Sequence, residues 1–178
     1  MPDKLTVFAL LFNLLAAAVF QDTLPALGGA PVKIVLLTAV ALHASAFRPK
    51  RYAMLAAILA GGFTDVLGGL PPLCTVSFLV MMLGVTRLFA RILHDPHLPH
   101  WVLFTAVTAV LQGIWTRLWI GGDGATALQT VARWCVLFAS GAIAGGVGFS
   151  WCGLVDRLSG LKKPVEEDNG IVWSENNR

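Results

Sequence analysis

The chain has 178 residues, of which 56% are hydrophobic and only 13% are charged, and its formal net charge is +3. Soluble proteins carry about 25% charged residues, so one globular core could not hide this much apolar surface, whereas lipid can solvate it. The basic residues do not form a stripe interleaved with aromatic residues, and nucleic acid is therefore not an expected partner.

Six apolar segments follow one another along the chain, separated by turns rich in glycine, proline or charge. A membrane-spanning helix needs about 20 residues, with a range of about 17–25. The predicted spans cover residues 5–24, 32–47, 52–70, 73–93, 100–120 and 125–152. The sequence therefore predicts an all-α, polytopic transmembrane helical bundle of about six spans over residues 1–155, followed by a polar cytoplasmic C-terminal tail over residues 156–178.

The first segment has the charge and hydropathy of a signal peptide, but residues 20–23 lack a small-residue cleavage pattern, and further spans follow. We interpret it as a retained helix. The second segment is short, although the side chain of Lys33 can reach outward and extend it.

The basic residues fix the expected orientation. If both termini are cytoplasmic and six spans alternate, ten of the thirteen Lys and Arg residues are cytoplasmic and three are not. The cytoplasmic set is Lys4, Arg48, Lys50, Arg51, Arg87, Arg91, Arg157, Lys162, Lys163 and Arg178. The positive-inside rule favours this arrangement. We expect a multi-pass protein of the bacterial cell inner membrane with both ends inside.

Asp65 is the only acidic residue well inside an apolar segment. An ionised Asp at a helix centre costs about 2.5–3.5 kcal/mol on insertion scales, so such residues point into protein and are functional candidates. Ala57 and Gly61 precede it at intervals of four, which predicts a face of small residues where a neighbouring helix approaches closely. Three roles stay open: a packing or partner contact, an interfacial Asp that reaches headgroup water or caps a helix near the glycines, and ion or proton coupling, for which His43 is the second candidate.

Glycine and proline flank Asp65 densely, at Gly61, Gly62, Gly68, Gly69, Pro71 and Pro72. Such density is typical either of a broken, re-entrant helix that lines a cavity or of a tight hairpin between two spans. The hairpin is the favoured interpretation.

Other motifs indicate packing more than chemistry. His94, His97 and His100 have metal-like spacing, but prolines extend the loop and no Cys or Glu joins them, so we expect no metal.

Gly141 and Gly145 form a close-packing face, either within the chain or toward a partner helix. Ser150 has no base at its depth, and paired carboxylates and phosphate-binding loops are absent. We expect a non-enzymatic protein without a cofactor, whose three cysteines are packing residues.

The order of features in about the first 90 residues resembles the MreD family of rod shape-determining membrane proteins. Gln21 stands near the end of the first span, Pro31 opens the second, a basic cluster follows, and Gly62, Asp65 and Pro72-Leu73 close the pattern. Cys74 stands where the family has glycine, which is a departure from the pattern.

The resemblance implies an integral membrane scaffold of the peptidoglycan elongation machinery that helps to regulate cell shape. Its expected partners are an MreC-like single-span protein and, indirectly, MreB, RodA and a transpeptidase. The implied contact or packing residues are Asp65, Gly61, Gly62, Gly68, Gly69, Pro72, Gln21 and Pro31. The family fold is similar to the substrate-binding subunits of vitamin transporters, so a solute-binding membrane subunit is the alternative.

Overall fold

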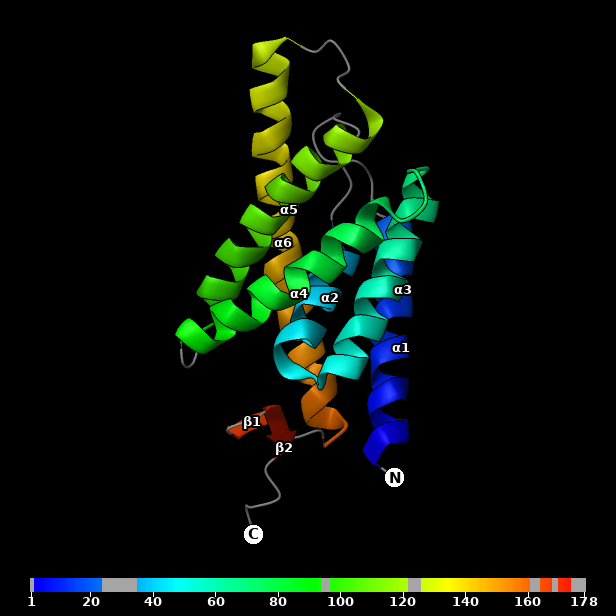
Figure 1. Cartoon of the computed structure of the whole chain (residues 1–178), viewed down its shortest axis with the longest axis vertical. Helices are drawn as coiled ribbons and strands as arrows, with labels where there is room; N and C mark the ends of the chain where they lie inside the picture. Colours follow the sequence, from blue (N-terminus) through cyan, green and yellow to red (C-terminus); the bar gives the residue numbers. More distant parts are fainter. Residues whose placement is uncertain are drawn as a thin grey trace.

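The computed structural model describes residues 2–23, 35–93, 97–121, 126–160, 164–167 and 170–173. The helices are α1 (Pro2–Thr23), α2 (Leu36–Phe47), α3 (Lys50–Gly68), α4 (Cys74–Ile92), α5 (Leu98–Ile120) and α6 (Ala127–Leu158). Figure 1 shows the start of α1, the α2–α3 corner and the end of α6 toward one end of the bundle. We call this the Arg48 end, and the opposite end, with the α3–α4 turn, the Asp65 end. The predicted all-α helical bundle is confirmed.

Within the described residues, four helices are long and apolar enough to cross a membrane, over Lys4–Thr23, Cys74–Ile92, Leu98–Ile120 and Leu128–Leu158. The chain is therefore a membrane protein. α3 has 19 residues but carries basic residues in its first turn and Asp65 in its last. α2 has 12 residues, and at 1.5 Å per residue it covers only about 18 Å of a hydrocarbon layer about 30 Å thick.

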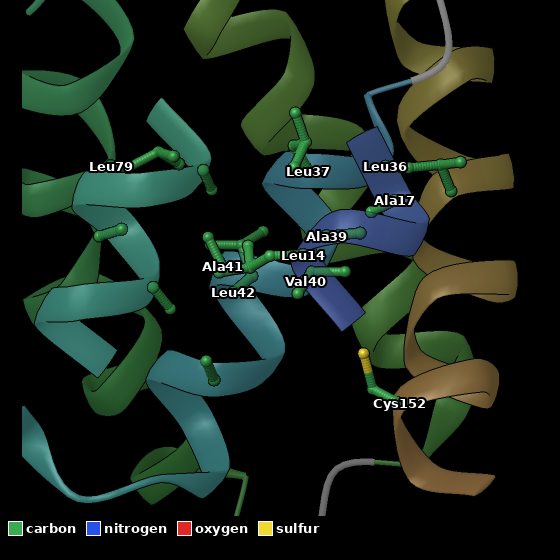
Figure 2. Close-up of a cluster of buried hydrophobic side chains, with 14 of the residues drawn as sticks. Leu14, Ala17, Leu36, Leu37, Ala39, Val40, Ala41, Leu42, Leu79 and Cys152 are labelled. Atoms are coloured by element: carbon green, nitrogen blue, oxygen red, sulfur yellow. The ribbon is translucent and has the colours of Figure 1, made fainter. Parts of the chain in front are cut away.

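α2 is the central helix of the bundle. Every residue from Leu36 to Ala46 is buried, and α2 contacts each of the other five helices. Figure 2 shows its side chains Leu37, Val40 and Leu42 among those of α1, α4 and α6. A helix that is apolar on all faces is typical of an enclosed position. The other helices cover α2, so its side chains pack against protein.

Small residues let the helices approach closely. A Cβ placed on Gly141 would lie 2.7 Å from the Cα of Ala106 on α5. A Cβ on Gly148 would lie 2.8 Å from the Cβ of Ala39 on α2. The close-packing face of α6 is therefore an internal contact of this chain, with α5 along one part and with α2 along another.

A buried ion pair closes the Arg48 end. Arg48, between α2 and α3, donates to the carboxylate of Asp156 near the end of α6, and their side chains are 4% and 18% exposed. Burial lowers the pKa of Arg48 from its ordinary value, and the charge of Asp156 opposes that shift. Arg87 of α4 donates to the backbone oxygens of Ser45, at 3.3 Å, and Arg48, at 3.2 Å. The carbonyls at the end of α2 thus bond to a side chain in place of water.

The helix boundaries differ from the predicted ones in two places. α6 continues to Leu158, so Asp156, predicted to open the polar tail, belongs to a helix. The described part of the tail contains two strands, β1 (Pro164–Glu167) and β2 (Gly170–Trp173), which pair antiparallel with Pro164 opposite Trp173. The sequence did not predict this hairpin. Pro31 and Lys33 lie outside the described residues.

Candidate functional site

The turn between α3 and α4 is built around Asp65. Gly69 adopts the left-handed conformation at φ 61°, which glycine reaches without a Cβ penalty. The N–H of Gly69 donates to the oxygen of Val66 at 3.3 Å, and that of Leu70 donates to the oxygen of Asp65 at 2.8 Å. This paired pattern terminates α3 as a Schellman motif. α3 is therefore one continuous, unbroken helix followed by a tight turn into α4, which agrees with the hairpin favoured from the sequence.

The side chain of Asp65 caps the next helix. Its Oδ1 accepts a hydrogen bond from the backbone N–H of Thr75, the second residue of α4, at 2.8 Å. Leu73, the residue at the cap position, has no side-chain oxygen for this role. A carboxylate at a helix N-terminus bonds an otherwise unpaired N–H group and interacts favourably with the helix dipole.

Asp65 is only 4% exposed, so its carboxylate faces protein and not lipid. The protein it faces is α4 of its own chain. Within the described residues, its second oxygen, Oδ2, and the hydroxyl of Thr75 are buried without a hydrogen-bond partner. Of the three roles considered for Asp65, the helix cap is the one with a visible hydrogen bond.

The glycines beside Asp65 have different environments. A Cβ on Gly61 would lie 2.6 Å from the Cα of Val76, so the close approach of α3 and α4 requires glycine there. A Cβ on Gly62 would meet nothing within 4 Å. Gly68 lies near the side chain of Leu70, and Pro72 is an exposed turn residue. The residues predicted around Asp65 therefore have three different environments. Gly61 makes an internal helix contact, Gly68 and Pro72 lie at the turn, and Gly62 faces outward.

Gln21 caps the N-terminus of α2, as Asp65 caps the N-terminus of α4. Its Oε1 accepts from the backbone N–H of Leu37 at 3.1 Å, while the hydroxyl of Ser140 on α6 accepts from the N–H of Val35 at 3.3 Å. Val35, at the cap position of α2, has no side-chain oxygen. A helix that begins inside an apolar layer needs such partners, because no water can satisfy its first N–H groups.

A cleft of about 410 Å³ lies beside the start of α2 at the Asp65 end, between α1, α3, α5 and α6. Gln21, Thr64, Gln112 and Thr116 supply polar groups to its wall. Gln112 Oε1 accepts from the hydroxyl of Thr38 on α2 at 2.8 Å, which fixes the glutamine side chain against the central helix.

The sequence indicated only part of this arrangement. Gln21, Asp65 and Gln112 are recognisable as polar residues in apolar segments, but Thr38 and Ser140 carry no such signal, because hydroxyl residues are common in membrane helices. Among the described residues, no three His, Cys, Asp or Glu side chains come together as a metal site would require.

Comparison with known proteins gives no relative: no family model, no characterised protein and no solved structure matches this chain.

Proposed function

We propose that the chain is a non-enzymatic scaffold subunit of the bacterial cell-wall elongation machinery, of the MreD type. In this proposal it lies in the inner membrane with both termini in the cytoplasm, and its Asp65 end faces outward. The order of Gln21, Pro31, the basic cluster, Asp65 and Pro72 in the sequence supports the family assignment. The proposed partner is an MreC-like single-span protein, through which MreB, RodA and a transpeptidase are reached.

The observation that carries the proposal is the outward face of α3. Ile58 and Val66, four residues before and after Gly62, are 46% and 80% exposed. Gly62 between them has open space where its side chain would be. Exposed apolar residues around an outward glycine form a notch, and a notch of this kind lets the backbone of another membrane helix approach closely.

The α3–α4 corner holds this face in place. The contact at Gly61 and the Asp65–Thr75 hydrogen bond join α3 to α4 on the side of α3 next to the notch. The predicted importance of Asp65 for partner binding is then indirect: the acid fixes the helix that carries the contact surface.

Depletion of the chain in its native bacterium tests the function. The scaffold proposal predicts rounded, lysis-prone cells, together with loss of the single-span partner from affinity-purified elongation complexes. Rod-shaped cells with normal wall synthesis after full depletion would contradict it.

A second candidate is a solute-binding subunit of a vitamin-type transporter. The cleft beside α2 favours it, since ligand pockets commonly measure about 300–1,000 Å³ and this one measures about 410 Å³. This candidate predicts vitamin auxotrophy on depletion, with normal cell shape, so the same experiment separates the two.

A further inference from the structure

The cleft contains two side chains whose hydrogen-bonding capacity is only half used. Gln21 and Gln112 are 7% and 6% exposed, and both line the cleft. Each uses its side-chain oxygen inside the protein, with Leu37 N–H and the Thr38 hydroxyl respectively. Since a backbone N–H can only donate, the oxygen of Gln21 must face Leu37 and its NH₂ group must face the other way.

Neither amide nitrogen has a protein partner in the part of the chain that the structure describes. Both residues line the cleft, so an acceptor oxygen on a ligand could give each NH₂ group a hydrogen-bond partner. The cleft therefore presents two hydrogen-bond donors from two different helices.

The hydroxyl groups of the wall already donate elsewhere. Thr64 donates to the oxygen of Ala60 at 2.8 Å, and Thr116 donates to the oxygen of Gln112 at 2.9 Å. Toward the cleft they offer only acceptor lone pairs. A ligand hydroxyl group fits this wall well, because it accepts from a glutamine NH₂ and donates to a threonine oxygen.

The charge of the lining excludes an anion. Of the described residues that line the cleft, none is Lys, Arg or His, and Asp22 places a carboxylate at its edge. The remaining wall is largely apolar, with Leu67, Leu70 and Leu137 among its residues. A negative charge on a ligand would lack a partner there.

We propose that this cleft binds an uncharged amphiphile of the glyceride class, whose hydroxyl and ester oxygens accept from the side-chain amides of Gln21 and Gln112. Its acyl chain lies against the leucines. The inference does not rest on the scaffold proposal, because the notch at Gly62 and the cleft have no residue in common.

The test compares three ten-carbon probes on the full chain in detergent, at equal mole fraction in the micelle: monodecanoylglycerol, decyl phosphate and decyltrimethylammonium. A ligand that binds only the folded state raises the thermal midpoint. We expect a concentration-dependent rise with monodecanoylglycerol that exceeds the rise with either charged probe. Equal shifts for the three probes, no shift, or the largest shift with a charged probe would overturn the proposal.

Two variants tie the effect to the cleft. Gln112→Met removes one donor at similar length, and we expect about tenfold weaker binding. Leu67→Trp fills the cleft from a position that is 40% exposed, while Val66→Trp, at a neighbouring position that is 80% exposed and outside the cleft, is its matched control. Binding should be lost in Leu67→Trp and kept in Val66→Trp. Unchanged binding in Leu67→Trp would refute the assignment even if Gln112→Met fails to fold.

Discussion

The Oδ1 atom of Asp65 accepts a hydrogen bond from the backbone N–H of Thr75, 2.8 Å away, and thereby joins the end of α3 to the beginning of α4. Gln21 makes the same kind of bond to Leu37 at the beginning of α2. Both helices begin after an apolar residue that cannot cap them. A side chain from another helix supplies the missing acceptor in each case, which couples the start of one helix to the position of its neighbour.

The cap at Thr75 predicts unequal effects for two substitutions of Asp65. Asp65→Asn keeps an acceptor oxygen of the same reach and should change stability little. Asp65→Leu leaves the Thr75 N–H buried without a partner, at a cost of about 1–3 kcal/mol. Thermal unfolding of the purified variants in detergent measures both. Equal midpoints for Asn and Leu would show that the hydrogen bond does not stabilise the corner.

Gly61 and Gly62 should respond differently to the same change. The added methyl group of Gly61→Ala would lie 2.6 Å from the backbone of Val76, whereas that of Gly62→Ala meets nothing within 4 Å. Overpacking of this kind costs about 1–3 kcal/mol, so we expect lower yield and a lower thermal midpoint for Gly61→Ala alone. Similar behaviour of the two variants would mean that α3 and α4 do not pack at Gly61.

The ion pair between Arg48 and Asp156 predicts that removing one partner lowers the free energy of unfolding more than replacing both partners with apolar residues. Removing one partner of a buried pair costs about 3–5 kcal/mol, because the other charge stays buried. Since the Asp156 side chain is 18% exposed, we expect Asp156→Ala to fall near the lower end of that range.

The double variant Arg48→Met/Asp156→Leu should regain much of the stability lost in Asp156→Ala, because it leaves no unpaired charge. Arg157→Ala, an exposed neighbour, is the control and should match the wild type. Additive losses in the double variant would argue against a coupled pair.

The uneven distribution of basic residues predicts the topology. A fluorescent protein fused after Arg178 should fluoresce, and alkaline phosphatase fused there should be inactive, because both results indicate the cytoplasm. Phosphatase fused after Gly121, at the end of α5, should be active. The reverse pattern at either position would rule out six alternating spans with both ends inside.

The sequence predicted the helices better than the contacts between them. Hydropathy located the six helices in the part of the chain that the structure describes, and the glycines and prolines around Asp65 located the hairpin, because these signals are local. The pairing of Arg48 with Asp156 could not be predicted, since the two residues are 108 positions apart and no local pattern relates them. The acceptor role of Ser140 was missed for the same reason: it depends on which face α6 turns toward α2.

Asp65 illustrates the limit for the candidate site. The cost of a charge in lipid correctly placed its side chain against protein, and it is 4% exposed. The sequence could not identify which protein it meets. The structure places α4 there, which moves the proposed partner surface from Asp65 itself to the adjacent outward face at Gly62.

Recovery of the proposed partner, a single-span MreC-like protein, with the affinity-tagged chain is the most direct test of that surface. Gly62→Leu fills the notch, and Gly84→Leu makes the same change on α4, where a Cβ also meets nothing within 4 Å. We expect both variants to reach the membrane at wild-type levels, with at least a fivefold loss of partner in Gly62→Leu and full recovery in Gly84→Leu. Equal partner recovery in the two variants, at equal expression, would contradict the assignment of α3 as the contact surface.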